Sequence, residues 1–382
     1  MIYRTLGKTG LKVSALGFGT MRLPMAADDK SVDRERALPL FGAAFEGGIN
    51  YIDSAVGYCS QDSQRVCGAA LAEWFAAGHP RNSIVVSTKN PHYDKADKAK
   101  WWTNLENSLE RLRVEQIDVY HHHSLDWKSF TEHVQGPDGL YREMLRARDQ
   151  GLIRFIGFSW HDEVEHLFKV IDSGLFDSMT CQYNLISRTN EEAFAHAHAR
   201  GMGVVVMGPV AGGRLGATAG PLGESLPAGV ATTPELALRF VLANPNVSVA
   251  LSGMTKLQDV RENLKTASRA AALTAAERRE MKDVVERMKK LADLYCTGCR
   301  YCEPCPQNIR IGDIFHHVIV HNVYGAKAAA IHGYAYMKKH SPAQGKRMAD
   351  ACKECGECEK KCPQKIPIIQ QLKEARKLLD RG

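Results

Sequence analysis

Long apolar runs are missing from this sequence. No apolar segment approaches the roughly 20 residues that a helix needs to span a membrane, and no apolar signal segment follows Met1. Cys59, Cys67 and Cys181 are scattered singly along the chain, as thiols are in a reducing compartment. We therefore expect a cytoplasmic protein without a membrane span.

Two further signatures are also missing. The basic residues are not interleaved with aromatic ones, so we expect no nucleic-acid partner despite a formal net charge of +7. The glycines of Gly17-Phe18-Gly19-Thr20 do not complete the G-x-G-x-x-G fingerprint of dinucleotide-binding open sheets. An open, doubly wound sheet therefore has little support.

Most of the cysteines are concentrated near the C-terminus. Eight of the eleven form two runs, Cys296-x-x-Cys299-x-x-Cys302-x-x-Cys305-Pro306 and Cys352-x-x-Cys355-x-x-Cys358-x-x-x-Cys362-Pro363. The second run has the spacing of the bacterial ferredoxin motif that holds a [4Fe–4S] cluster, and the first is one residue shorter before its last cysteine. Structural zinc uses paired C-x-x-C knuckles instead, and disulfides do not suit a reducing compartment. We expect two [4Fe–4S] clusters, with the second run the closer match.

In two-cluster ferredoxins the fourth cysteine of each run binds the other cluster. Cys305 would then join Cys352, Cys355 and Cys358, and Cys362 would join Cys296, Cys299 and Cys302. Basic residues also concentrate late, as in Lys338-Lys339-His340 and Lys360-Lys361. They either form a solvated face that offsets the charge of the clusters or dock an acidic redox protein partner.

The first 270 residues alternate short apolar runs, rich in Val and Ile, with amphipathic helical stretches. Runs that are apolar at their centres are typical of strands covered on both faces. We expect strands over residues 15–20, 52–53, 84–89, 117–123, 153–159, 179–183, 204–207 and 247–252, and helices over 34–46, 97–112, 191–199 and 234–242. Eight strands with helices between them predict a (β/α)8 TIM barrel, with residues 2–6 in a hairpin across its floor.

A chain of 382 residues suits one large domain plus a small one. We expect the barrel over residues 1–272 and a connecting helix over 273–295, opened by the capping box Thr274-Ala275-Ala276-Glu277. A small, mostly helical ferredoxin-like iron–sulfur domain follows over 296–382, with helices near 311–323 and 326–338.

Four chemically active residues follow the ends of expected strands, where a barrel has its active site. They are Asp53, Tyr58, Lys89 and His123. A free phenol with a pKa near about 10 is a weak acid at neutral pH, but a neighbouring Lys89 ammonium lowers that pKa. Asp53 would hold Lys89 and keep it charged, and His123 would orient a substrate oxygen. Taken singly, these residues could equally be a helix-capping aspartate, a core tyrosine and a surface lysine.

Three histidines stand together at the end of the fourth strand. Strand alternation puts His121 and His123 on one face and His122 on the other. A metal site made only of histidines is an alternative interpretation of this triple.

The contexts of these residues, Asn50-Tyr51-Ile52-Asp53-Ser54-Ala55-Val56-Gly57-Tyr58, Val85-Val86-Ser87-Thr88-Lys89 and Asp118-Val119-Tyr120-His121-His122-His123, resemble the aldo-keto reductase superfamily. With the cysteine runs, the chain is similar over essentially its whole length to the branch that carries a C-terminal 4Fe-4S ferredoxin-type domain. The resemblance implies an oxidoreductase that uses NADH or NADPH to reduce a small carbonyl substrate to an alcohol, or the reverse. The family motif Asp-x-Tyr-x-x-His assigns the catalytic histidine to His123.

The resemblance also implies the cofactor contacts. Ser159 and Gln182 would meet the nicotinamide carboxamide, Met207 stands where many relatives stack an aromatic ring, and Asn263 would meet the adenine. The phosphates would meet the loop after the eighth strand and the helix that follows it. The full expected set is Gly19, Thr20, Met21, Asp53, Ser159, Gln182, Met207, Gly253, Met254, Lys256 and Asn263.

The position of the arginine with which NADPH-preferring relatives bind the 2′-phosphate corresponds to Asp259, whose charge would repel that phosphate. Lys256 lies close and could compensate in part. We therefore expect NADH to be used at least as well as NADPH.

Two other functions remain open at the level of sequence. One is an iron–sulfur electron-transfer protein whose barrel is a docking scaffold, against which the intact set of four catalytic residues argues. The other is a reductase whose clusters are only structural. A hydride carries two electrons and a cluster accepts one, so coupling them needs an intermediary such as a flavin, and the sequence shows no flavin motif.

Overall fold

The computed structural model describes residues 1–27, 30–185, 187–216, 226, 229–269, 276, 279, 283, 296, 301–322 and 327–380. The chain divides into two compact units. The first unit comprises Met1–Tyr183, Arg188–Pro209 and Leu238–Ala272, and the second comprises Asn184–Ser187, Val210–Ala237 and Leu273–Gly382. Most of the capping box and nearly all of the expected connecting helix over 273–295 lie outside the described residues.

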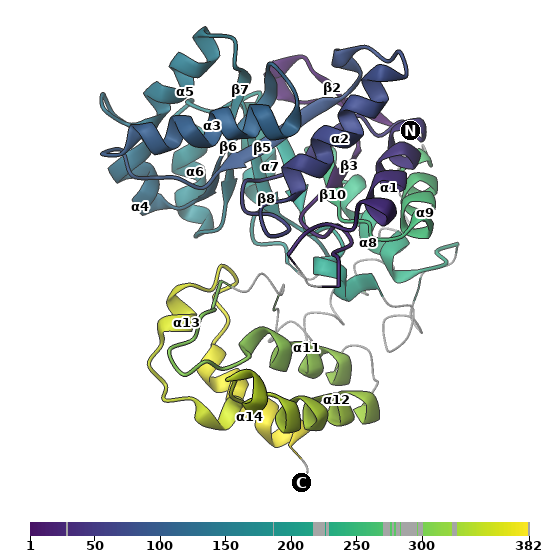
Figure 1. Cartoon of the computed structure of the whole chain (residues 1–382), viewed down its shortest axis with the longest axis vertical. Coiled ribbons are helices and arrows are strands. Elements are labelled where there is room, and N and C mark those ends of the chain that lie inside the picture. Colours follow the sequence, from purple (N-terminus) through teal and green to yellow (C-terminus); the bar gives the residue numbers. More distant parts are fainter. Residues whose placement is uncertain are drawn as a thin grey trace. The chain divides into compact units, whose positions relative to one another are not determined.

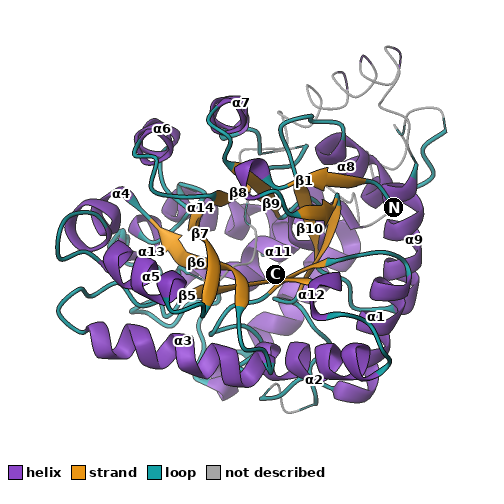
Figure 2. Ribbon diagram, turned by 90° about the horizontal axis from the view of Figure 1, so that it is seen from above, coloured by secondary structure: helices purple, strands orange, loops and turns teal. Residues whose placement is uncertain are grey.

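Eight parallel strands close a barrel in the first unit (Figure 2). Around the barrel they follow the order β10-β3-β4-β5-β6-β7-β8-β9. Each expected strand is present, with bounds shifted by at most a few residues. The strands are β3 (Leu16–Gly19), β4 (Tyr51–Asp53), β5 (Val85–Asn90), β6 (Ile117–Leu125), β7 (Ile153–Trp160), β8 (Ser178–Gln182), β9 (Gly203–Met207) and β10 (Val249–Ser252).

Helices alternate with these strands along the chain and surround them (Figure 2). They are α1 (Arg34–Glu46), α2 (Ser63–Ala76), α3 (Lys98–Leu112), α4 (Trp127–Ser129) with the π-helical turn η3 (Phe130–Val134), α5 (Leu140–Asp149), α6 (Val164–Asp172), α7 (Glu191–Ala199), α8 (Thr233–Leu242) and α9 (Leu257–Ser268). Short 3-10 turns add η1 (Gly7–Thr9), η2 (Arg81–Ser83) and η4 (Ala211–Gly216). The four helices expected from the sequence match α1, α3, α7 and α8 within one residue at each end.

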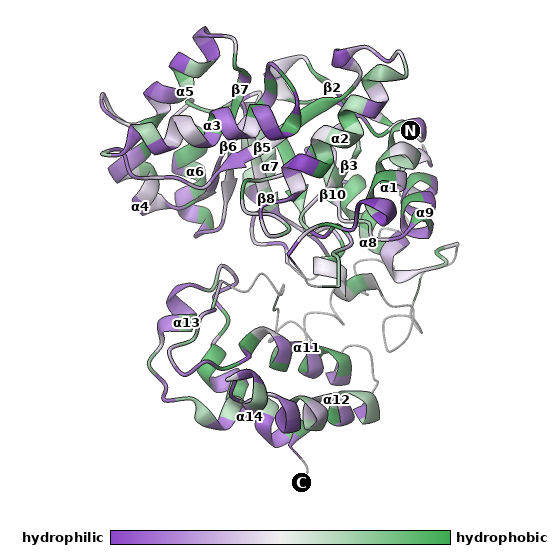
Figure 3. Ribbon diagram, in the orientation of Figure 1, coloured by the Kyte–Doolittle hydropathy of each residue, from purple (hydrophilic) through white to green (hydrophobic). Residues whose placement is uncertain are grey.

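Local sequence explains where these helices begin and which face they bury. The side chain of Asp33 caps α1 by accepting the backbone N–H of Arg36 at 3.2 Å. Asp97 caps α3 in the same way through the N–H of Lys100 at 3.1 Å. Helix α3 then buries Trp101 and Leu105, one turn apart, and turns its charged residues outward. Figure 3 shows this contrast, with hydrophilic stretches on α3 and α5 and hydrophobic strands β3 and β10.

A hairpin closes one end of the barrel. Strands β1 (Tyr3–Thr5) and β2 (Lys12–Ser14) pair antiparallel, as expected. Leu6 and Val13 pack against inward-facing strand residues such as Tyr51 and Val119. The hairpin lies at the N-terminal ends of the strands, so ligands enter at the C-terminal ends.

In the described part of the second unit, four helices lie toward the C-terminus of the chain. They are α11 (Ile311–Asn322), α12 (Lys327–His340), α13 (Glu357–Lys360) and α14 (Ile368–Leu379), with 3-10 turns η7 (Pro342–Gln344) and η8 (Ala349–Ala351). Helices α11, α12 and α14 pack side by side (Figure 1) around a core that includes Ile314, Phe315, Tyr334 and Leu372. The two helices expected here match α11 and α12. Within the described residues, no helix is both long and apolar enough to cross a membrane.

Candidate active site and cluster-binding cysteines

Strand register brings Asp53 and Lys89 together. Asp53 ends β4 and pairs with Ser87 of β5, two residues before Lys89. The Lys89 ammonium donates to Asp53 Oδ2 and, at 2.8 Å, to the carbonyl oxygen of Ser54. Both side chains are buried, with Asp53 at 3% and Lys89 at 1% exposure. The pair is therefore a buried, hydrogen-bonded ion pair rather than a surface lysine near a capping aspartate.

Tyr58 lies next to this ion pair. It is half-buried in the loop after β4, and Lys89 Nζ is 4.9 Å from the centre of its ring. Burial would lower the pKa of Lys89, but the charges of Asp53 and Tyr58 and hydrogen bonds with both outweigh it, so the pKa is raised. Lys89 therefore stays positively charged beside the phenol, as the proton chemistry expected of Tyr58 requires.

His123 completes the group of four. Its ring meets the Tyr58 ring edge to face, with centres 5.7 Å apart. Burial, together with the charge of Lys89, holds the pKa of His123 well below its usual range. The imidazole is therefore neutral at pH 7, and it can donate or accept a hydrogen bond without adding charge.

A break in strand β6 accompanies the placement of His123. The pairing of β6 with β7 shifts register between His122 and Leu125, and Ser124 adopts a positive φ of 58°. Ser159 anchors this bulge, because its Oγ accepts the N–H of Ser124 at 2.7 Å. Bulges beside active sites commonly re-aim a side chain, so Ser159 supports the placement of His123 besides its expected role as a cofactor contact.

His161 belongs to the same neighbourhood, although the sequence had not indicated it as a site residue. It follows β7 directly and is half-buried. Burial and the charge of Lys89 lower its pKa to about 4, and a charge on His161 would in turn lower the pKa of His123. The rule that residues after barrel strands face the active site would have identified it.

The histidine triple divides as strand alternation predicts. His121 faces the barrel interior, where its Nε2 is 3.0 Å from Ser87 Oγ. His122 points the other way and packs against the rings of Tyr93 and Phe176. Among the described residues, no three His, Cys, Asp or Glu side chains are arranged to hold a single metal ion. The interpretation as a histidine metal site therefore gains no support.

The expected nicotinamide contacts lie at the same end of the barrel. Ser159, Gln182 and Met207 stand at or next to the last residue of three successive strands, and Gln182 pairs with Met207 in register. Ser159 is buried, while Gln182 is 9% exposed and Met207 is half-buried.

On the opposite side of the mouth, the side chains of two expected contacts, Thr20 and Met254, are already engaged or buried within the protein. Thr20 Oγ1 is 2.7 Å from Ser63 Oγ and donates to the carbonyl of Asp53 at 3.0 Å. Gly19 ends β3, Met21 is 44% exposed, and Met254 has its side chain fully buried. A ligand would therefore reach Thr20 and Met254 through the backbone.

The N-terminus of α9 is capped by Asp259. Its Oδ2 accepts the backbone N–H groups of Thr255 and Lys256, each at 3.0 Å. Gly253 lies in the loop before this helix, and Asn263 is largely buried and donates to Ser252 Oγ at 3.1 Å. Asp259 thus has a structural role besides the one expected toward a 2′-phosphate, because its carboxylate occupies N–H groups that would otherwise attract an anion.

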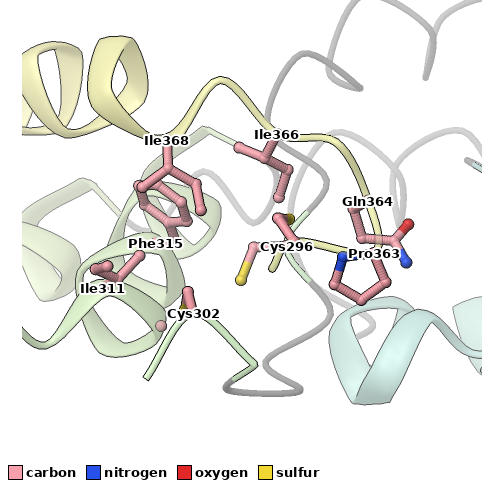
Figure 4. A pocket seen from close by; sticks show the side chains of 10 residues that line it. Cys296, Cys302, Ile311, Phe315, Pro363, Gln364, Ile366 and Ile368 are labelled. Atoms are coloured by element: carbon pink, nitrogen blue, oxygen red, sulfur yellow. The ribbon is translucent and has the colours of Figure 1, made fainter. Parts of the chain in front are cut away.

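In the second unit, cysteines from the two runs mix. Cys296 and Cys302 of the first run and Cys362 of the second line one cavity, together with Ile311, Phe315, Gly312, Pro363, Gln364, Ile366 and Ile368 (Figure 4). Cys299 lies outside the described residues. Three soft thiols around an apolar hollow suit an iron–sulfur cluster.

The other grouping is complementary. Burial raises the pKa of Cys358 to about 11, and Cys305 and Cys352 pack against the same buried cluster as Cys358. Cys355, between them in sequence, is exposed. The exchange of fourth ligands that the sequence suggested requires this arrangement, with Cys362 near the first run and Cys305 near the second.

Comparison with known proteins finds two family matches along the chain. The Aldo/keto reductase family matches residues 15–286, and the 4Fe-4S dicluster domain matches residues 295–367. The chain belongs to the aldo/keto reductase family. It is an aldo-keto reductase-like oxidoreductase with a C-terminal 4Fe-4S dicluster domain, as the sequence predicted.

Individual relatives resemble about three quarters of the chain. L-galactose dehydrogenase of Arabidopsis thaliana is 28% identical over 319 residues, covering 75% of this chain and 95% of the relative. The NADH-specific methylglyoxal reductase of Escherichia coli is 25% identical over 332 residues, covering 74% and 98%. The structure of aldo-keto reductase AKR11C1 from Bacillus halodurans in its holo form superposes with a TM-score of 0.63 at 28% identity, covering 74% and 96%.

Proposed function

We propose that this oxidoreductase reduces a small carbonyl compound to an alcohol, or runs the reverse reaction, with a nicotinamide cofactor. The observation that carries the proposal is the buried Lys89 ammonium, which is held by Asp53 and lies against Tyr58. Burying a charge costs free energy, so a lysine buried this deeply against a phenol indicates a role in the acid–base chemistry of that phenol.

The reduced cofactor, when bound, supplies a hydride to the carbonyl carbon. Tyr58 donates its phenolic proton to the carbonyl oxygen, and Lys89 stabilises the phenolate that remains. Asp53 keeps Lys89 charged and directed at the phenol. The neutral imidazole of His123 donates a hydrogen bond to the same oxygen and orients it. In the oxidative direction Tyr58 takes the proton back.

The choice between NADH and NADPH depends in this proposal on the N-terminus of α9. Ser159 and Gln182 would hold the carboxamide of the nicotinamide, and the loop with Gly253 would approach the phosphates. The carboxylate of Asp259 at the N-terminus of α9 disfavours an additional phosphate there. We therefore propose that NADH is used at least as well as NADPH, and the name of the Escherichia coli relative points in the same direction.

For the C-terminal region we propose two [4Fe–4S] clusters that exchange single electrons with a protein partner. We assign residues 1–272 to the barrel, 273–295 to a connecting helix and 296–382 to the cluster domain. The mixed grouping of Cys302 with Cys362 and of Cys305 with Cys358 supports two clusters with exchanged fourth ligands. A purely structural role for the clusters is the competing proposal.

The barrel chemistry is tested by Tyr58→Phe. Carbonyls are screened with NADH and NADPH, using anaerobically purified protein. We expect the variant to lose at least roughly 10²-fold in turnover, as for removal of a general acid, with cofactor affinity unchanged. Tyr336→Phe, at a 63% exposed tyrosine of α12, is the matched control. Near wild-type turnover in Tyr58→Phe would remove Tyr58 from the mechanism.

The cluster proposal is tested by iron and sulfide analysis of the anaerobic protein. Two clusters correspond to about eight irons per chain, whereas four or fewer would exclude the two-cluster arrangement. A full complement of iron that no low-potential donor reduces would favour the structural role.

A further inference from the structure

Ser87 and His121 are two buried polar residues behind the candidate active site that take no direct part in the proposed proton transfer. We propose that Ser87 and His121 are positioning residues, which fix the Asp53 carboxylate so that Lys89 is aimed at Tyr58. The inference rests on the role proposed for Tyr58. The chain of contacts runs from His121 through Ser87 and Asp53 to Lys89.

Both oxygens of the Asp53 carboxylate are engaged. Oδ2 accepts from the Lys89 ammonium, and Oδ1 accepts from the Ser87 hydroxyl at 2.9 Å. With only one of these contacts the carboxylate could rotate about its own axis. The second contact removes that freedom, so the direction of the Lys89 hydrogen bond is set by Ser87.

The directions of these hydrogen bonds determine a tautomer. Ser87 has one hydroxyl hydrogen, and a carboxylate can only accept, so that hydrogen points to Asp53. Toward His121, at 3.0 Å, Ser87 can then only accept. His121 must therefore carry its hydrogen on Nε2. His121 thereby holds the Ser87 hydroxyl in the orientation in which its hydrogen points to Asp53.

The surroundings keep His121 neutral. Its side chain is fully buried, and Nδ1 makes no hydrogen bond of normal geometry, although the backbone of Phe158 lies within reach of the ring and partly offsets the lowering of the pKa. Burial and the charge of Lys89 lower its pKa to about 3. A neutral imidazole adds no positive charge to compete with Lys89 for Asp53.

The other groups around His121 and Ser87 are consistent with a neutral His121. His122 adds slightly to the effect on His121, while the backbone of Phe158 acts in the opposite direction. Tyr51, also buried, lies close to Ser87 and has a raised pKa, so it remains a neutral phenol.

The neighbouring strand makes room for the imidazole. Gly157 of β7 lies beside His121 in register. A Cβ atom at Gly157 would lie 2.5 Å from His121 Nδ1 and 2.7 Å from Ser178 Oγ, so a larger residue cannot be accommodated. Bulky branched residues usually fill barrel interiors. A glycine that leaves space for a buried histidine indicates that this histidine serves a purpose other than packing.

The test compares Ser87→Ala and His121→Leu with Ser87→Thr and His121→Gln, which keep the hydroxyl and an N–H donor. The readout is the pKa of Tyr58, followed by ¹³C-tyrosine NMR of the full-length protein and assigned through Tyr58→Phe. We expect the first two variants to raise that pKa by roughly half a unit to one unit and to move the alkaline limit of kcat upward. The conservative variants restore both, and KM for the carbonyl stays within about twofold, because neither residue touches substrate.

Histidine ¹⁵N NMR of the wild-type protein checks the tautomer separately. His121, assigned through His121→Gln, should remain the Nε2–H form between pH 5 and 9. The Nδ1–H form, or a Tyr58 pKa unchanged in Ser87→Ala and His121→Leu despite lower thermal stability, would overturn the inference. These signals do not depend on turnover, so they can fail while Tyr58→Phe still abolishes activity. Conversely, they can hold even if no carbonyl is reduced.

Discussion

The barrel site and the cysteine-rich region differ in how their buried reactive groups are stabilised. In the barrel, the buried charge of Lys89 is matched by Asp53 within the polypeptide. In the second unit, Cys296 and Cys362 are buried among apolar side chains, and burial raises the pKa of Cys358 to about 11. Iron binds thiolates, so cluster assembly there has to remove protons. The buried charge in the barrel is compensated by the polypeptide alone, whereas the cysteine sites would need a metal.

The two regions also differ in their formal net charge. Residues 296–382 contain 15 of the 50 Lys and Arg but only 8 of the 43 Asp and Glu, and so account for the whole formal net charge of +7. The preceding residues are balanced. Thiolate-bound clusters would bring negative charge into the region that has the excess of positive charge, which reduces its self-repulsion.

The largest expected effect separates the two regions directly. Cys358→Ala should lose the cluster held by the second run, or about four of about eight irons, and should leave the C-terminal region open to proteolysis while NADH binding persists. Cys181→Ala, at a buried cysteine of the barrel, is the matched control and should keep its iron. Full iron content in Cys358→Ala would contradict the ligand assignment.

A smaller but still large effect is expected inside the barrel. Lys89→Met leaves the Asp53 carboxylate buried without a partner, which should lower the free energy of unfolding by about 3–5 kcal/mol. Adding Asp53→Leu removes that unpaired charge, so the double variant should recover much of the stability but none of the activity. Urea denaturation and a carbonyl assay measure the two quantities. A double variant as unstable as Lys89→Met would show that the ion pair is structural.

The next prediction concerns the effect of burying His122 on the pH dependence of stability. Its pKa is lowered by burial to about 3, while the unfolded chain takes up a proton near the usual 6.5. Stability therefore falls as the pH drops from 6.5 toward 3, by about 1.4 kcal/mol per pH unit. His122→Phe should be more stable than wild type by about 2 kcal/mol at pH 5 and little different at pH 8. Equal stabilisation at both pH values would indicate better packing instead.

The smallest effect concerns cofactor choice. Asp259→Arg should shift the preference toward NADPH by about tenfold, because a cation replaces a carboxylate near the expected 2′-phosphate. Asp259→Asn is the control, since it keeps a capping oxygen for the N–H of Lys256 and removes only the charge. Titration of both nucleotides measures the change. Much tighter binding of NADPH by the wild type would show that Lys256 or another residue dominates.

Much of the candidate active site could be predicted from the sequence alone. Strand pattern placed Asp53, Lys89 and His123 at strand ends, because apolar alternation and helix caps act over a few neighbouring residues. The spacing of the cysteine runs identified the second region in the same local way, and the match to a 4Fe-4S dicluster domain confirms it.

Contacts between strands needed the folded chain. No sequence pattern connects Ser87 with His121, because that contact depends on how two neighbouring strands align. The grouping of Cys362 with Cys302 was expected only by analogy with ferredoxins. Sequence by itself determined which elements form and which reactive groups end them. Tertiary structure decided which of those groups touch, since the stagger of barrel strands and the folding back of the cysteine runs join residues far apart in the chain.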